Sequence, residues 1–260
     1  MTFIDSHCHI NDDALFPRRK EIIEEARQNG VSLFIVPGWD MESSEKAITI
    51  AHEFEGVYAA IGFHPENLGM VSDDALKRIE LMAKDKKVVA IGEIGLDYHW
   101  FKEEKDRKNQ KQWFIKQIDL ANRLNLPTSI HCREASEDTF LLLKEHPLKA
   151  KGVLHCYSGS TELLREFAKL GLFFGFDGPI TYKNALTPKN NVIACPVDRI
   201  LSETDSPYLS PVPYRGKENH PAYVKEVVLQ MATLRGIPVE EMASMIQKNT
   251  ESLFHVEQKQ

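Results

Sequence analysis

Six residues with metal-binding side chains follow short apolar runs along the chain. His7 and His9 stand one residue apart directly after the run at 2–6, and single histidines or carboxylates end four later runs. The full set is His7, His9, Glu93, His131, His155 and Asp205. Side chains of a strand alternate between its faces, so residues two positions apart point the same way. The pattern therefore predicts imidazoles and carboxylates that converge on divalent metal ions.

Four imidazoles and two carboxylates exceed what one ion requires, because catalytic zinc usually takes three protein ligands and a water. Two ions bridged by one carboxylate fit this inventory better. We expect the paired histidines of the first run to share one ion, and His131 and His155 to hold the other. Glu93 lies between these groups in chain order and is the expected bridge. Asp205 is expected to bind the first ion and to accept a proton from a water there.

These ligands need a scaffold that brings strand ends together. Apolar runs that predict strands lie at about 2–6, 32–37, 57–62, 88–93, 126–131, 152–156, 171–176 and 199–204. Helical patterns separate them at roughly 17–29, 43–54, 73–84, 107–124, 134–145, 160–170 and 187–194, and two more follow around 221–235 and 238–252. Eight alternations without a break in composition predict one α/β domain over 1–260, a (β/α)8 TIM barrel with C-terminal helices. In that fold the active site lies at the carboxyl ends of the strands, where the six ligands fall.

Composition and charge limit the class of protein. An apolar content of 42% and a charged content of 27% are ordinary for a globular enzyme. No stretch approaches the roughly 18 apolar residues of a membrane span, and the first twenty residues carry three aspartates before any lysine or arginine. We therefore expect a cytoplasmic protein without a secretory signal or membrane contact. The net charge of −6 argues against broad coating of nucleic acid but permits a phosphate held locally.

Four cysteines show neither CxxC spacing nor a small disulfide framework. Cys8, Cys132 and Cys156 each follow one of the predicted ligands directly, and Cys195 stands apart. If the histidines face a site, strand alternation points the three adjacent thiols to the opposite side. We expect them to be small buried packing groups.

Several longer motifs give the chain a resemblance to the TatD family of metal-dependent deoxyribonucleases, which are amidohydrolase-like barrels. The most specific motifs are HCYSG at 155–159 and TDSPYL at 204–209, followed by RGKxNxP at 215–221. The others are DSHCH at 5–9, IGFHP at 61–65, IGEIGLDY at 91–98, HCR at 131–133 and GPITYKNA at 178–185. The resemblance implies that the six residues above are the metal ligands, with Glu93 in the place of the carbamylated lysine of some barrels.

The resemblance also implies two divalent ions per chain. A histidine-rich set favours Zn, Mn, Ni, Co or Fe over Mg by ligand softness, whereas the family's nuclease activity is usually described with Mg. Two residues depart from the family pattern. His220 stands where a glutamate is more usual, a difference that we expect to have no effect, and Asp177 stands where a small or hydroxyl residue is more usual. Its charge is expected either to weaken phosphate binding or to recruit a further cation.

Other polar residues near the strand ends are candidates for contacts with substrate. His64 either donates a hydrogen bond to a phosphate oxygen or caps a helix, and Arg133 either grips phosphate bidentately or pairs with Glu134 or Glu137. Aromatic and basic residues in the later loops suit stacking and backbone contacts with single-stranded nucleic acid, or else form a solvated face. These are Tyr157, Tyr182, Lys183, Arg215 and Lys217.

Two further carboxylates accompany the predicted ligands. Glu203 lies two residues before Asp205 on the same predicted face, where it either binds substrate or supports the ligands. Asp97 follows a glycine turn and is expected to brace the loop.

The sequence therefore predicts a metal-dependent hydrolase of nucleic-acid phosphodiesters, and the resemblance implies a 3′-to-5′ exonuclease that acts on single-stranded DNA ends in DNA repair. The ions would polarise the phosphoryl oxygen and acidify water. Asp205 would act as general base, Glu93 would bridge the ions, and His64 and Arg133 would steady the developing charge. The alternative is a carbonyl hydrolase, such as a D-aminoacyl-tRNA deacylase, because fold does not fix function. No obligate protein partner is expected.

Overall fold

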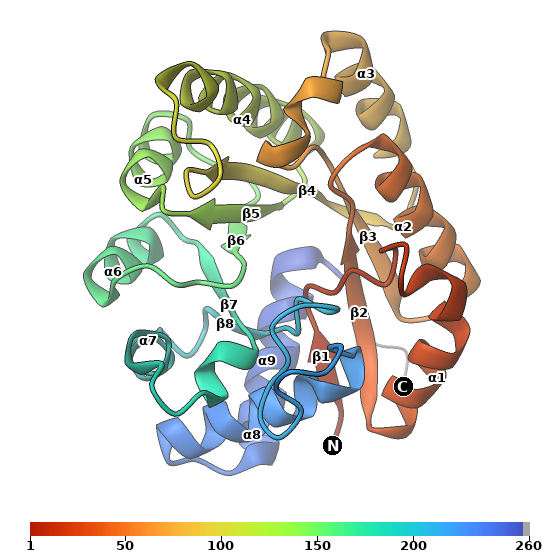
Figure 1. The fold of residues 1–260 in the computed structure, drawn as a ribbon, viewed down its shortest axis with the longest axis vertical. Helices are drawn as coiled ribbons and strands as arrows, with labels where there is room; N and C mark the ends of the chain where they lie inside the picture. The colour runs from red at the N-terminus through yellow and green to blue at the C-terminus, as the bar shows by residue number, and fades with distance from the viewer. Residues whose placement is uncertain (257–260) are drawn as a thin grey trace.

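The computed structural model describes residues 1–256, whose strands form one parallel sheet curved into a barrel (Figure 1). Its eight strands are β1 Phe3–Asp5, β2 Val31–Pro37, β3 Val57–Ile61, β4 Val88–Asp97, β5 Thr128–Arg133, β6 Gly152–Leu154, β7 Phe173–Phe176 and β8 Ile200–Ser202. Each strand pairs in parallel with the next along the chain, so the order in the sheet is the order in the sequence. The predicted (β/α)8 barrel is confirmed.

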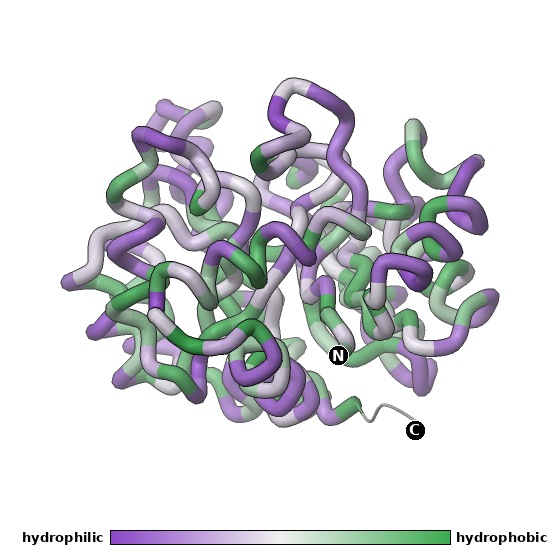
Figure 2. The backbone as a smooth tube through the Cα atoms, turned by 90° about the horizontal axis from the view of Figure 1, so that it is seen from below, coloured by the Kyte–Doolittle hydropathy of each residue, from purple (hydrophilic) through white to green (hydrophobic). Residues whose placement is uncertain are grey.

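The helices surround the strands (Figure 1). They are α1 Arg19–Gln28, α2 Met41–Glu53, α3 Asp73–Met82, α4 Glu104–Leu124, α5 Ser136–Glu145, α6 Thr161–Lys169, α7 Leu186–Ala194, α8 Val224–Arg235 and α9 Val239–Phe254. Short 3-10 helices are η1 Phe16–Arg18, η2 Pro65–Met70, η3 Gly178–Thr181 and η4 Pro221–Tyr223. Figure 2 shows hydrophobic and hydrophilic residues alternating along the outer helices, as expected for helices with one buried face. No helix in residues 1–256 is long and apolar enough to cross a bilayer.

Two boundaries differ from the sequence prediction in ways that matter for the site. β4 does not end at Glu93 but continues to Asp97, because Gly95 and Asp97 stay in register with His131 and Arg133 of β5. Pro221 opens the 3-10 helix η4 rather than α8, which begins at Val224. The longer β4 carries both Glu93 and Asp97 toward the same end of the barrel.

The barrel closes between its first and last strands through a few hydrogen bonds. The Ser6 N–H donates to the Ser202 carbonyl oxygen at 3.0 Å, and the Ser202 hydroxyl donates to the Ile4 carbonyl oxygen at 2.7 Å. The carboxyl group of Asp5 accepts the Thr204 N–H at 2.9 Å and bonds to the Thr204 hydroxyl at 2.6 Å. Helices α8 and α9 contact β1 here, and α9 also contacts β8. This closure holds the residues after β1 beside those after β8.

We predict that Asp5 is needed for closure of the barrel. Burial raises the pKa of Asp5 to about 8 against the opposing hydrogen bonds from Thr204, so the side chain is neutral at pH 7. Asp5→Ala should lower the free energy of unfolding by about 2–4 kcal/mol, because the N–H groups of His7 and Thr204 lose their acceptor. Asp5→Asn keeps an acceptor and the shape of the neutral acid, so it should be much milder.

Urea unfolding followed by circular dichroism measures both variants against the unchanged protein. Equal unfolding midpoints for Asp5→Ala and the unchanged protein would contradict this role.

Candidate metal centre

The first group of predicted ligands meets just beyond the ends of β1 and β8, beside Glu93 of β4. The Nε2 atom of His7 lies 3.3 Å from Nε2 of His9 and 3.4 Å from Oε2 of Glu93. The same atom of His9 lies 3.3 Å from Oδ1 of Asp205. Asp205 is held there by its own backbone, whose N–H donates to the His7 carbonyl oxygen at 2.9 Å.

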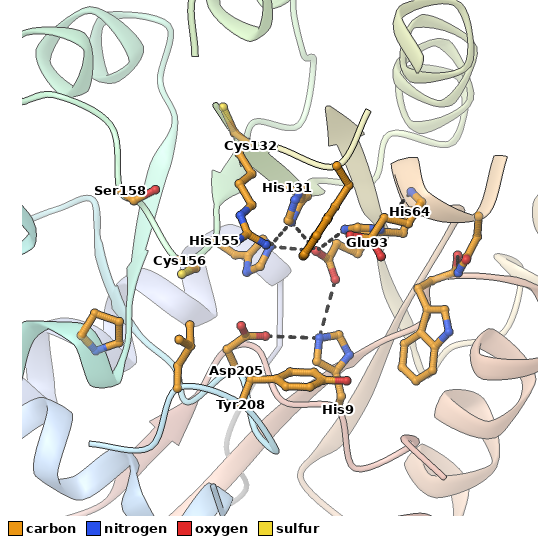
Figure 3. A pocket seen from close by; sticks show the side chains of 17 residues that line it. His9, His64, Glu93, His131, Cys132, His155, Cys156, Ser158, Asp205 and Tyr208 are labelled. Atoms are coloured by element: carbon orange, nitrogen blue, oxygen red, sulfur yellow. Dashed lines mark hydrogen bonds and ion pairs between the residues drawn. The ribbon is translucent and has the colours of Figure 1, made fainter. Parts of the chain in front are cut away.

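The second group meets at the other oxygen of Glu93. Its Oε1 atom lies 3.1 Å from Nδ1 of His131 and 2.8 Å from Nε2 of His155. The two imidazole nitrogens are 3.2 Å apart. Figure 3 shows the Glu93 side chain between His9 on one side and His131 and His155 on the other.

These spacings suit divalent ions. Ligand atoms about 2.0–2.1 Å from a tetrahedral ion lie roughly 3.3–3.4 Å from one another, which is close to the spacings within both groups. Nitrogen and carboxylate oxygen are also the donors that first-row divalent metals take. The structure therefore brings together all six side chains that the sequence singled out, in two sets that meet at Glu93.

Buried charges of both signs balance one another in this cluster. Burial alone would raise the pKa of Glu93, but the surrounding imidazoles outweigh it and hold that pKa well below its ordinary value. Burial likewise opposes charge on His155, yet Glu93 and Glu203 raise its pKa well above the usual range. The pKa values of His9 and His131 are also raised, by neighbouring carboxylates. Positive charge on the imidazoles thus balances the carboxylates, and metal ions that bind here would displace the imidazole protons.

Two carboxylates behind the cluster orient its histidines. Oδ2 of Asp97 lies 3.0 Å from Nε2 of His131, which leaves Nδ1 of that ring facing Glu93. Oε1 of Glu203 lies 3.6 Å from Nδ1 of His155. A carboxylate on the second ring nitrogen fixes the tautomer and raises the basicity of a metal-binding histidine. Asp97 also accepts the N–H groups of the following loop, so it both braces the loop, as predicted, and orients a histidine, which the sequence did not show.

Two glycines make room for the Glu203 carboxylate and for the backbone of His131. A Cβ atom at Gly175 of β7 would overlap the Glu203 carboxylate. Gly95 of β4 has a φ of 144°, and a Cβ there would overlap the His131 carbonyl. Both positions need glycine because another group occupies the space of a side chain.

His64 caps a helix, as one of its two predicted roles requires, and its ring also lies beside the cluster. It begins η2, where its Nδ1 atom accepts the Glu66 N–H at 3.2 Å, and its Nε2 atom lies 3.4 Å from Oε1 of Glu93. Burial and the nearby His131 lower its pKa, so the neutral ring is favoured. A neutral ring that accepts at Nδ1 carries its proton on Nε2. His64 therefore presents a hydrogen-bond donor to the cluster, rather than a lone pair for a metal.

A cavity of about 770 Å³ opens over the cluster, within the size range of small-molecule sites. Arg133 lines it and lies with its guanidinium carbon 5.6 Å from the ring centre of Trp100. Arg133 pairs with neither Glu134 nor Glu137. Glu134 pairs with His99 instead, and no ion pair involves Arg133 within residues 1–256. Trp100 and Tyr208, which the sequence analysis did not single out, also line the cavity and are 63% and 55% exposed.

Four residues predicted to bind substrate do not line this cavity. Tyr157 is buried, with its hydroxyl donating to the Ser160 carbonyl and its ring against Phe174, which leaves no surface for a ligand. Glu203 is buried behind His155. Tyr182 donates to the Ser210 carbonyl and lies under the guanidinium of Arg215 at 4.2 Å. The Tyr182–Arg215 pair lies outside the cavity lining.

The prediction that the thiols point away from the site is correct for two of the three. Cys8 is buried, with its sulfur against the Ile35 carbonyl. Cys132 borders the cavity, but its sulfur lies against the Ser136 and Thr139 hydroxyls of α5. Cys156, however, lines the cavity with its sulfur near Asp177 and Asp205. Cys156 lies beyond the end of β6 with a φ of 44°, so strand alternation no longer fixes the direction of its side chain.

We predict that Asp97 tightens metal binding through His131. Asp97→Ala should weaken retention of metal by about 10- to 100-fold, the usual effect of losing such a partner. Chelator competition with metal-loaded protein measures this loss. Asp198→Ala is a matched control, because this aspartate pairs with Arg199 and lies outside the cavity lining. Unchanged retention in Asp97→Ala would remove Asp97 from the metal centre.

Known proteins resemble the chain over nearly its whole length. The model of the family described as "TatD related DNase" matches residues 4–255. The chain is 43% identical over 253 residues to a Bacillus subtilis (strain 168) protein named "Uncharacterized metal-dependent hydrolase YabD", a match that covers 97% of this chain and 98% of the relative. It is 35% identical over 261 residues to the Escherichia coli (strain K12) "Uncharacterized metal-dependent hydrolase YcfH", covering 99% of this chain and 97% of that one.

A solved structure agrees with the sequence relatives. The crystal structure of YJJV, a TATD homolog from Escherichia coli K12, superposes with a TM-score of 0.92 at 33% identity and 98% coverage of both chains. The family match and the relatives both extend over the residues that build the barrel and the metal cluster. The chain therefore belongs to the TatD family of metal-dependent hydrolases.

Proposed function

We propose that this chain is a two-metal hydrolase of nucleic-acid phosphodiesters, a deoxyribonuclease that removes nucleotides from single-stranded ends in the 3′-to-5′ direction. The observation that carries the proposal is the placement of Glu93, whose two oxygens face two separate sets of ligands under one cavity. Two ions about 3.5–4 Å apart are typical of enzymes that displace at phosphorus. The match to a family described as "TatD related DNase" supports DNA as the substrate.

Each ion has its own ligands in this proposal. His7, His9 and Asp205 would hold one ion, His131 and His155 would hold the other, and the carboxylate of Glu93 would be shared. When bound, Zn, Mn, Ni, Co, Fe or Mg ions supply a Lewis acid that polarises the phosphoryl oxygen and makes water more acidic.

Asp205 is the proposed general base. Burial would raise its pKa, but hydrogen bonding with His9 and the charge of nearby imidazoles hold that pKa below its ordinary value. The carboxylate is therefore charged at neutral pH. It lines the cavity, where it can take the proton of an attacking water.

His64 and Arg133 are the proposed partners of the phosphate. The Nε2–H group of His64 points to the cluster and donates to a phosphoryl oxygen as charge develops there. Arg133 offers a planar pair of donors that match a phosphate oxygen pair. The exposed rings of Trp100 and Tyr208 provide stacking surfaces for bases of a single strand at the same cavity.

A substrate panel with Arg133 variants tests this function. The panel contains 5′- and 3′-labelled single- and double-stranded DNA, RNA and aminoacyl-tRNA, each with several metals. We expect cleavage of single-stranded DNA from the 3′ end. Arg133→Ala should reduce it by about 10- to 150-fold, the effect of losing a hydrogen bond to a charged group. Arg133→Lys should recover only part, because lysine lacks the bidentate fork.

The controls separate phosphodiester from carbonyl chemistry. Arg78→Ala should leave cleavage unchanged, because Arg78 lies on α3, pairs with Glu45 and does not line the cavity. No cleavage of any DNA or RNA substrate by the unchanged protein, together with hydrolysis of aminoacyl-tRNA, would refute the nuclease and establish a deacylase.

A further inference from the structure

A second cluster of metal-binding side chains adjoins the centre on the side of β6 and β7. Cys156 follows β6, Asp177 follows β7 and Asp205 follows β8, so the three come from neighbouring strands of the barrel. One ligand atom from each lies within 4.8 Å of the other two. Cys156 and Asp205 also line the cavity, where Figure 3 shows the Cys156 thiol near the Asp205 carboxylate.

Asp177 is the unexplained member of this cluster. It is only 3% exposed, and its Oδ2 atom has no hydrogen-bond partner within residues 1–256. Asp205 adds a second, partly buried carboxylate that is already paired with His9. A buried carboxylate oxygen without a donor is costly, so such groups usually pair with a cation or another donor. The six ligands described above leave Asp177 without a function.

The composition of the cluster favours a metal ion over other cations. A thiol beside two carboxylates offers a soft donor and two hard ones, a combination that zinc and cobalt accept readily. Three ligand atoms within 4.8 Å of one another leave room for one bare ion among them. An organic ammonium group would gain little from the sulfur, which is a weak hydrogen-bond acceptor.

We propose that Cys156, Asp177 and Asp205 form a third divalent-cation site, with the Asp205 carboxylate shared between this ion and the neighbouring one. The proposal extends the proposed two-metal centre and rests on it only through Asp205. Binding exchanges the thiol proton of Cys156, which passes to solvent, for a bond from sulfur to the ion. The third ion would add positive charge to the side of the cavity lined by Cys156 and Ser158, where an incoming phosphodiester would meet it.

Metal counting and cobalt spectroscopy test the site. Metal-saturated protein is freed of loose metal by gel filtration, and bound metal per chain is measured for the unchanged protein and for Asp177→Ser, Asp177→Asn and Cys156→Ser. We expect three ions in the unchanged protein and two in Asp177→Ser and Cys156→Ser. The cobalt-loaded protein should show sulfur-to-cobalt charge-transfer absorption in the near ultraviolet, which Cys156→Ser abolishes and both Asp177 variants weaken.

A matched control identifies the sulfur. Cys132 lines the same cavity, but its sulfur lies 3.3 Å from the Thr139 hydroxyl, so Cys132→Ser should keep the absorption and the third ion. Two ions in the unchanged protein and in every variant, without the absorption, would overturn the proposal and leave a water or an ammonium group in the cluster. Failure of the two-metal centre itself gives another result, namely fewer than two ions in Asp177→Ser.

Discussion

The buried carboxylate of Glu93 is the group on which the metal centre depends. A lone carboxylate in an apolar barrel would be too costly to ionise, but this one faces imidazoles from both sides of the barrel mouth. The pKa of Glu93 is low and that of His155 is raised because the carboxylate and the protonated imidazole stabilise each other. Positive charge therefore suits the positions around Glu93. Removing the Glu93 carboxylate would leave several mutually repelling imidazoles with no common partner.

The barrel makes this convergence possible because parallel strands deliver all their carboxyl ends to one rim. Closure between β1 and β8 then matters chemically as well as structurally, since it places His7 beside Asp205. Farther from the cavity, Asp97 and Glu203 hold the rings of His131 and His155 from behind. The same few side chains therefore depend on barrel closure, on the orientation of the imidazole rings and on the balance of charge. Substitutions at Asp97 or Glu203, behind the site, should alter metal binding.

The strand-end histidines and the order of elements were predictable, because a period of two and a strand–helix alternation are visible in the sequence alone. Features that depend on three-dimensional register were not. The contact of Asp97 with His131 depends on the continuation of β4 past Glu93. The four-residue spacing of Glu93 and Asp97, which puts both carboxylates on one face of a strand, could have indicated it. The inward turn of Cys156 and the burial of Tyr157 follow from a positive φ after β6, where alternation no longer applies.

Anomalous diffraction from crystals of metal-loaded protein tests the bridging role of Glu93 most directly. Data collected on both sides of the absorption edge of the bound metal locate each ion independently of the protein atoms. We expect one ion beside each oxygen of Glu93, about 3.5–4 Å apart, with His7 and His9 at one and His131 and His155 at the other. A single ion in fully loaded crystals, with the Glu93 carboxylate away from it, would contradict the account.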